Sequence, residues 1–304
     1  MYLCIYYHYY NTLIMEKEYI VLGRQDAVAK NNSPYANLRI ASSKSDILQV
    51  CVFDTPKDKG PHIGQVISFI REMRDYQGKK SANLMDLQIL GDAQEGTELY
   101  KLVPRPIKRE EWDGCIERLC SMCSDKALVA IISDQKQKLF DLYVKYPAAT
   151  QVHHAFPGGL LNHTYQMLHM LEGIFPTLPY QEEIKIERCV LAIMFHDWGK
   201  TLEYDLDGET TKYMYLLGHI FMSAQMLNGI LSNAGIDKEE SRLIVHCVLS
   251  HHGELEYGSP IKPCIPEAQL VNYLDNISAK ADIFHTTGNM EKNFALGTHV
   301  VKAE

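Results

Sequence analysis

The sequence predicts a mixed fold of two domains, in which a small antiparallel β-barrel precedes an all-α domain. Three observations indicate it. The chain has 304 residues, more than the roughly 100 to 200 that one domain usually holds. Residues 18–90 alternate short β-branched runs with turn residues, a pattern typical of strands. After Pro147, apolar residues recur at helical spacing, and 11 of the 13 histidines lie between His153 and His299.

The composition is 46% hydrophobic and 22% charged, which excludes a disordered, collagenous or low-complexity protein. With 30 basic and 38 acidic residues the net charge is −8, so bulk attraction to polyanions is excluded and any nucleic-acid site must be local. The 8 cysteines form no regular framework, which predicts reduced thiols in the cytoplasm. No run approaches the roughly 20 apolar residues that span a membrane, so we expect no membrane partner.

Residues 1–15 are interpreted as an extension. The first fourteen are rich in aromatic residues but contain no Lys or Arg, so they lack the basic start of a secretory signal. An ordinary segment begins at Met15. We expect the preceding residues to come from an overlong gene assignment; the alternative is a hydrophobic docking arm.

The barrel is expected over residues 16–103. Its strand-like runs are residues 18–29, 36–42, 47–54, 63–74 and 81–90. Turn residues separate these runs, and the last two runs form a long hairpin around Tyr76, Gln77 and Gly78. Five short strands in about 75 residues suggest an OB fold, with an SH3-like barrel as the alternative.

Basic character is concentrated in the first part of the chain. Residues 16–110 hold 15 basic and 13 acidic residues, a net +2, whereas residues 111–304 hold 15 and 25, a net −10. A mix of aromatic and basic side chains suits the stacking of bases and contact with phosphates. The candidate nucleic-acid-binding residues are Tyr35, Phe53, Arg71, Arg74, Tyr76, Lys79 and Lys80. The alternative is that Phe53 and Phe69 are core residues and that the charges lie in solvated turns.

The rest of the chain has helical spacing. In residues 104–150, Ile107, Trp112, Ile116 and Leu119 recur at helical intervals, and we expect a helical connector there. Residues 151–304 are the second domain.

The helices of this second domain carry histidines and carboxylates where apolar residues would face the core. His163 lies beside an apolar stripe, and His196-Asp197 ends a strongly apolar helix whose expected C-cap is Gly199. The further candidate ligands are His219, His246, His251, His252 and Asp275. Burying so many imidazoles and carboxylates is costly unless they pair or bind a metal. Imidazole and carboxylate ligands without cysteine suit Mn²⁺, Fe²⁺, Co²⁺ or Zn²⁺ better than Ca²⁺.

Two residues of this segment are the candidate catalytic groups. A carboxylate such as that of Asp197 can bridge two ions, which would clamp a phosphoryl group while activating a water. Lys200, one turn beyond, is placed to neutralise a phosphate oxygen. Alternatively, Lys200 is a lysine at the C-terminal end of a helix that interacts with the helix dipole.

The order of His163, His196-Asp197 and Asp275 resembles the H…HD…D signature of the HD-domain metal-dependent phosphohydrolases. The segments HHAFPGGLLNHT, FHDWGK, GHI, LSHHGELEYGSP and EAQLVNYLDNISAK together resemble the YhaM-type 3′-to-5′ exoribonucleases, which place an OB fold ahead of an HD domain. This resemblance covers residues 16–290. It implies a fold of an OB-like barrel followed by an all-α HD domain at residues 151–304.

The resemblance also implies a ligand set. It assigns the first of two metals to His163, His196, Asp197 and Asp275, and the second to His219, His251 and either His252 or His246. Asp197 bridges the ions, Lys200 holds a non-bridging phosphate oxygen, and His153 and His154 lie near the ligands or at the entrance. Mn²⁺ is the expected metal, and Fe²⁺, Co²⁺, Mg²⁺ and Zn²⁺ are the alternatives.

The activity that follows is 3′-to-5′ hydrolysis of single-stranded RNA, with single-stranded DNA as an alternative substrate. The resemblance also allows a homo-oligomer. Two other functions stay open: hydrolysis of a small or cyclic nucleotide by the HD domain, and nucleic-acid binding without catalysis. Trp198 departs from the aliphatic residue common in the HDxGK motif. The net charge of +2 is modest for a nuclease, whose affinity depends on neutralised phosphates.

Overall fold

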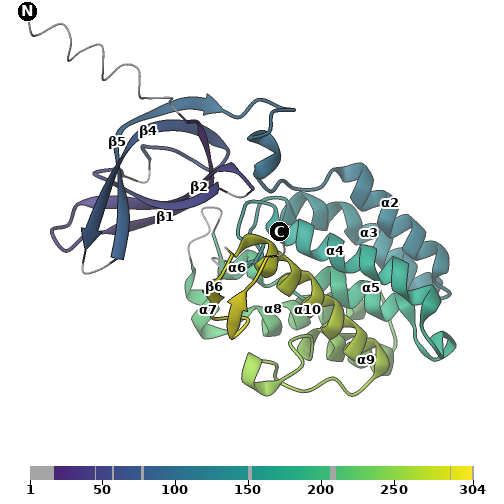
Figure 1. Ribbon diagram of the computed structural model, residues 1–304. Coiled ribbons are helices and arrows are strands. Elements are labelled where there is room, and N and C mark those ends of the chain that lie inside the picture. The colour runs from purple at the N-terminus through teal and green to yellow at the C-terminus, as the bar shows by residue number, and fades with distance from the viewer. Residues whose placement is uncertain are drawn as a thin grey trace, which may run out of the picture. The chain divides into compact units, whose positions relative to one another are not determined.

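The computed structural model describes residues 17–302 except 45, 57, 77–78, 150–152, 206–209 and 288, and only the backbone of residues 70–85. The predicted extension therefore lies outside the described residues. The chain divides into two compact units, one ending at Pro104 and one beginning at Arg105 (Figure 1). Each unit is described by itself.

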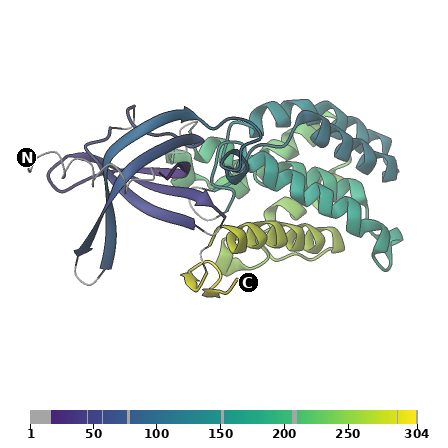
Figure 2. The same ribbon diagram turned by 45° about the horizontal axis from the view of Figure 1, so that its top comes forward.

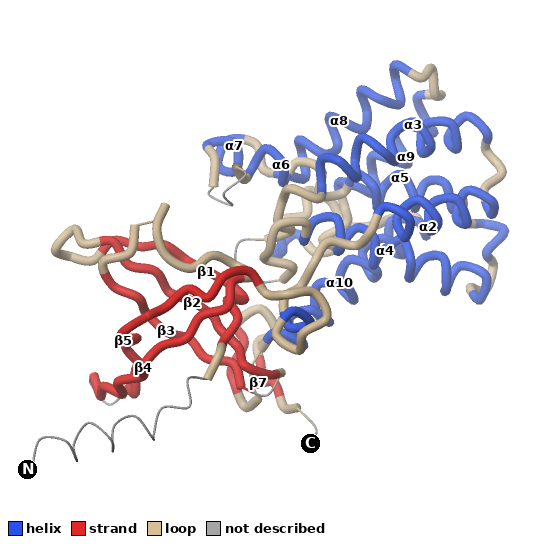
Figure 3. Tube along the Cα trace, turned by 90° about the horizontal axis from the view of Figure 1, so that it is seen from above, coloured by secondary structure: helices blue, strands red, loops and turns tan. Residues whose placement is uncertain are grey.

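Five strands of the first unit close into a barrel with the order β1-β2-β3-β5-β4. The strands are β1 (Tyr19–Val28), β2 (Pro34–Ser43), β3 (Asp46–Phe53), β4 (Gln65–Tyr76) and β5 (Lys79–Asp92), followed by the 3₁₀ turn η1 (Tyr100–Leu102). Neighbouring strands are antiparallel except β3 and β5, which pair in parallel. Figure 3 shows these strands in red. The closed five-stranded barrel confirms the OB-like prediction.

The barrel core follows from the alternation of the sequence. In β2, Ala36, Leu38 and Ile40 are buried while the residues between them are partly or fully exposed. Successive side chains of a strand point to opposite faces, so this period of two places one face inside the barrel. Val50 and Val52 of β3 continue the same core.

The second unit is helical, with a short hairpin at its end. Its helices are α2 (Arg109–Met122), α3 (Lys126–Tyr143), α4 (Gly159–Ile174), α5 (Ile186–Phe195), α6 (Lys200–Glu203), α7 (Lys212–Leu216), α8 (His219–Asn233), α9 (Lys238–Leu249) and α10 (Pro266–Thr286). The 3₁₀ turns are η2 (Phe175–Thr177), η3 (Gln181–Glu183) and η4 (Leu255–Tyr257), and the hairpin strands are β6 (Glu291–Asn293) and β7 (Thr298–Val300). Figure 2 shows α10, in yellow-green, beside α4, in teal. Among the described helices, none is both long and apolar enough to cross a membrane.

The segment expected as a connector is part of the helical core. Trp112, Ile116 and Leu119 of α2 are buried in the same cluster as residues of α4 and α5. The indole Nε1 of Trp112 donates a hydrogen bond of 2.9 Å to the carbonyl of Lys136, which joins α2 to α3. The segment is helical, as expected, and its apolar stripe packs against the other helices.

Helix α5 lies at the centre of this unit. All but one of its residues are buried, and it packs against α2, α3, α4, α9 and α10. A helix that is apolar on all sides is stable only when other elements surround it. Residues that follow α5 are consequently held inside the unit.

Candidate metal centre

His196 and Asp197 directly follow α5, so the buried helix sets their position. The chain then turns through Gly199, whose backbone is right-handed helical (φ −60°) and which precedes α6. The prediction of Gly199 as the C-cap is therefore wrong: His196 is the C-cap of α5, and Gly199 is the N-cap of α6. A Cβ at Gly199 would lie 2.3 Å from the carbonyl oxygen of His219. Glycine is required because the first residue of α8 approaches the backbone this closely.

Four predicted ligands converge at this turn from three parts of the fold. The Nε2 atom of His163, on α4, lies 3.1 Å from Oδ1 of Asp275, on α10, and 3.2 Å from Nε2 of His196. Oδ2 of Asp197 lies 3.3 Å from Nε2 of His196 and 3.8 Å from Nε2 of His163. These four side chains form what we call the first ligand group.

The imidazoles of the first group are held by their Nδ1 atoms. Nδ1 of His196 lies 2.7 Å from the carbonyl oxygen of Ile193. A carbonyl can only accept, so Nδ1 carries a proton and Nε2 is the nitrogen that faces the group. Ser278 Oγ donates to Gln166 at 2.8 Å and lies 2.9 Å from Nδ1 of His163, which leaves Oγ free to accept from that nitrogen. Such partners fix the orientation of a metal-ligating histidine.

A second ligand group lies on the other side of Asp197. It consists of His219, at the start of α8, and His251 and His252, just after α9; one ligand atom of each lies within 4.8 Å of the others. Oδ1 of Asp197 lies 3.6 Å from Nε2 of His219 and 3.8 Å from Nε2 of His251. The two oxygens of one carboxylate thus face two different groups of imidazoles.

The second group is oriented in the same way as the first. Nδ1 of His251 donates to the carbonyl of Val248 at 2.7 Å, and Nδ1 of His252 donates to that of Tyr257 at 2.8 Å. Glu203 accepts the backbone N–H of His219 at 2.6 Å and lies 3.2 Å from its Nδ1. Glu203 is a functional residue that the sequence analysis missed, since a glutamate three residues after a lysine carries no signal of its own.

The unpartnered atoms of the centre fit a divalent cation. Oδ1 of Asp197, Nε2 of His219 and Nε2 of His251 are buried and have no hydrogen-bond partner in the described chain. Leaving a buried polar atom unsatisfied costs about 1–3 kcal/mol. Three such atoms face the same place, and all are nitrogen or oxygen ligands of the kind that binds Mn²⁺, Fe²⁺ or Zn²⁺. A cation would satisfy all three.

The protonation states also suit a metal. Burial works to raise the pKa of Asp197, but the nearby charges of Lys200 and His196 outweigh it and hold that pKa well below its ordinary value. Burial, together with His252 and His196, lowers the pKa of His251 well below its ordinary value. The centre therefore combines an ionised carboxylate with a neutral imidazole at neutral pH, the forms that bind metals.

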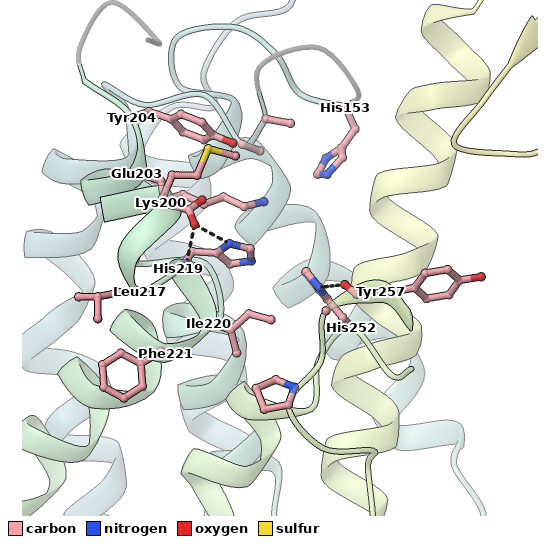
Figure 4. Close-up of a pocket in the computed structure, with 16 residues that line it drawn as sticks. His153, Lys200, Glu203, Tyr204, Leu217, His219, Ile220, Phe221, His252 and Tyr257 are labelled. Atoms are coloured by element: carbon pink, nitrogen blue, oxygen red, sulfur yellow. Dashed lines mark hydrogen bonds and ion pairs between the residues drawn. The ribbon is translucent and has the colours of Figure 1, made fainter. Parts of the chain in front are cut away.

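Lys200 is the cation nearest the shared carboxylate. Its Nζ lies 2.7 Å from Oδ2 of Asp197. Lys200 also lines a pocket of about 550 Å³ together with His219 and His252 (Figure 4). The remaining wall is mainly apolar and includes Tyr204, Met214, Leu217, Ile220, Phe221 and Tyr257. The pocket gives a ligand access to one side of the centre.

Three predicted or expected histidines lie outside the two groups. Nε2 of His246 accepts a hydrogen bond of 3.1 Å from the backbone N–H of Cys264, so the structure does not bring His246 to the centre. The rings of His153 and His154 lie beside that of His163, with centroid distances of 5.1 Å and 5.4 Å. His153 also lines the pocket, as expected of a residue at the entrance.

The candidate nucleic-acid residues of the barrel divide into two sets. Tyr35 of β2 and Phe53 of β3 are paired across the strands, with ring centroids 5.9 Å apart. Phe53 is 53% exposed, so the alternative that it is a core residue is wrong. The other five lie on β4 and β5, and their side chains are outside the described residues: Arg71, Arg74, Tyr76, Lys79 and Lys80.

Comparison with known proteins agrees with this geometry. The family model of the HD domain matches residues 160–280. The chain is 28% identical over 271 residues to the 3′-5′ exoribonuclease YhaM of Geobacillus sp. (strain WCH70), with 84% of this chain and 79% of that protein covered. It is 26% identical to the protein of the same name from Bacillus velezensis, with 88% and 85% covered. No solved structure matches the chain.

Proposed function

Because residues 160–280 belong to the HD domain family, we propose that this protein is a metal-dependent 3′-to-5′ exoribonuclease that acts on single-stranded RNA. The observation that carries the proposal is the pair of ligand groups that share Asp197 beside Lys200. A bridging carboxylate between two cation sites is the arrangement used to cleave phosphodiesters. The similarity to exoribonucleases over most of the chain supports RNA as the substrate.

We assign the metal ligands from the two groups. His163, His196, Asp197 and Asp275 would hold one ion, and Asp197, His219, His251 and His252 the other. His246 is left out because Cys264 occupies its Nε2. Mn²⁺ is the first metal to test, followed by Fe²⁺, Co²⁺, Mg²⁺ and Zn²⁺. When bound, the ions would activate a water and stabilise the charge that develops on the phosphoryl oxygens.

The residues of the chain supply position and charge. Lys200 is buried, but Asp197 keeps its pKa above the ordinary value, so it stays an ammonium that can contact a phosphoryl oxygen. The pocket of about 550 Å³ lies within the usual size of small-molecule sites, roughly 300–1,000 Å³. Its apolar wall can receive a nucleobase without reading its identity, because every base has an apolar face. Such a wall suits an exonuclease without sequence preference.

The barrel would bind the RNA strand. Replacing both Tyr35 and Phe53 by Ala is expected to weaken binding of a single-stranded RNA about 10- to 100-fold, since stacking contributes about 1–3 kcal/mol per base. Fluorescence anisotropy with a labelled oligonucleotide measures this. The matched control is Tyr35→Phe, which keeps the ring and should keep the affinity. Unchanged affinity in the double variant would show that these rings do not contact RNA.

The direct test of the proposed function is a denaturing gel of RNA labelled at its 5′ end and incubated with the protein and Mn²⁺. We expect a ladder that shortens from the 3′ end and that is absent with EDTA. RNA blocked by a 3′-terminal phosphate is the matched substrate control, and single-stranded DNA tests whether the 2′-hydroxyl is needed. Intact RNA in every lane would instead favour a small-nucleotide phosphohydrolase.

We also place the protein in the cytoplasm. The seven cysteines of the described chain are free thiols, which is the state kept by the reducing cytoplasm.

A further inference from the structure

Tyr204 lines the pocket beside the centre and has no role so far. Its side chain belongs to a residue that is only 6% exposed, and the described chain forms no hydrogen bond with its hydroxyl. Figure 4 shows this hydroxyl and the ammonium of Lys200 directed to the same side of the pocket. Tyr204 is part of the wall of this pocket, so a ligand in the pocket can accept a hydrogen bond from the hydroxyl.

The local fold sets the position of Tyr204. Its backbone N–H donates to the carbonyl of Lys200 at 3.0 Å, which closes the single turn of α6. Tyr204 directly follows the last residue of α6, and both Lys200 and Tyr204 line the pocket. The backbone after the turn is fixed by a bridge between Tyr204 and Thr210, and by a hydrogen bond of 2.7 Å from Thr211 N to Glu203 O.

Both of these groups are donors. Burial raises the pKa of Tyr204, and the charge of Lys200 opposes this only in part, so the phenol keeps its proton at neutral pH. Of the carboxylates nearby, Oδ2 of Asp197 contacts Lys200 and Oε1 of Glu203 accepts from His219. A neutral hydroxyl beside an ammonium suits an anion with several oxygens.

We propose that the hydroxyl of Tyr204 donates a hydrogen bond to a phosphoryl oxygen of the 3′-terminal nucleotide, next to the oxygen that Lys200 contacts. This inference rests on the proposed function, because it takes the pocket as the site of that nucleotide. Tyr204 thereby binds the substrate through its phosphate and not through its base or sugar. A contact with the ribose hydroxyls is the competing assignment.

The test compares the wild-type protein with Tyr204→Phe, which removes the hydroxyl and keeps the ring. Loaded with Mn²⁺, both are titrated calorimetrically with AMP and with adenosine. We expect Tyr204→Phe to weaken AMP binding about tenfold, as for loss of a hydrogen bond to a charged group, and to leave adenosine binding unchanged. Its kcat/KM on RNA should fall by a similar factor. Tyr180→Phe, at an exposed tyrosine outside the pocket, is the matched control.

Three other results overturn the assignment. Equal AMP affinity in both proteins, or no AMP binding by the wild type, removes the phosphate contact. Equal losses for AMP and adenosine place the hydroxyl on the nucleoside. Mn²⁺ affinity and the melting temperature must stay unchanged in Tyr204→Phe; a change in either shows a structural role. If the wild type degrades no RNA but the AMP effect is present, the phosphate contact stands and the exonuclease proposal fails.

Discussion

Replacing Asp197 by Asn is expected to lower kcat/KM on RNA by at least about a thousandfold, the scale seen when one member of a cooperating catalytic set is removed. The variant keeps the shape of the side chain and removes its charge. Oδ2 contacts Lys200 at 2.7 Å, and Oδ1 faces the unpartnered Nε2 atoms of His219 and His251. An amide is neutral, so the variant could not offer a negatively charged oxygen to each of the two ligand groups. Gel assays with labelled RNA measure the loss.

This experiment needs a control which shows that the variant has lost activity and not its folded structure. Removing one partner of a buried ion pair costs about 3–5 kcal/mol, so circular dichroism must show that Asp197→Asn is folded at the assay temperature. RNA affinity should stay near that of the wild type, because the barrel residues are unchanged. Asp134→Asn removes a carboxylate that pairs with Lys138 on the surface of α3, and should leave turnover unchanged. Turnover retained by Asp197→Asn would refute the proposed centre.

The elements of the fold could be predicted where their patterns were local. Alternation in β2, with Ala36, Leu38 and Ile40 inward, predicts a strand without knowledge of its neighbours. The unbroken apolar run of α5 likewise predicts a buried helix. The expected strands match the observed ones to within a few residues at most ends, since turn residues mark those ends.

The details that could not be predicted depend on contacts between distant residues. Gly199 resembles a helix stop signal, but its hydrogen atom is needed to admit the backbone of His219. Glu203 and Tyr204 acquire roles only because α6 faces the centre. His246 and His251 carry the same signal in the sequence; only the structure shows that His251 lies beyond the end of α9 and that Nε2 of His246 accepts from Cys264.

Removing divalent metal is expected to abolish RNA hydrolysis and to lower the melting temperature, with Mn²⁺ restoring both. A metal at about a thousand times its Kd stabilises the folded state by about 4 kcal/mol, which corresponds to a shift on the order of 10 °C for a unit of this size. The physical source is the set of buried ligand atoms that have no partner in the described chain. Calorimetry with and without EDTA measures the shift.

The same experiment has a pH dependence with a definite sign. Burial and neighbouring histidines lower the pKa values of His251 and His252 below the ordinary value of 6.5. Below that pH the unfolded chain binds protons that the folded chain does not, so the metal-free protein loses stability as the pH falls. The slope is about 1.4 kcal/mol per pH unit for each such proton. The lowered pKa of Asp275 also makes the stability fall as the pH falls, over a lower pH range. The raised pKa of His196 acts in the opposite direction, because at that residue the folded chain binds up to one proton more than the unfolded chain.

Glu203→Gln separates a metal effect from a general loss of stability. The carboxylate orients His219, and changing such a partner usually lowers metal affinity about 10- to 100-fold. The variant should require correspondingly more Mn²⁺ for half-maximal activity and for the thermal shift. Glu239→Gln, at an exposed glutamate paired with Arg242, is the matched control. A Mn²⁺ thermal shift without hydrolysis of any phosphodiester would mark the centre as a structural site, because catalysis needs an open coordination position that a structural site lacks.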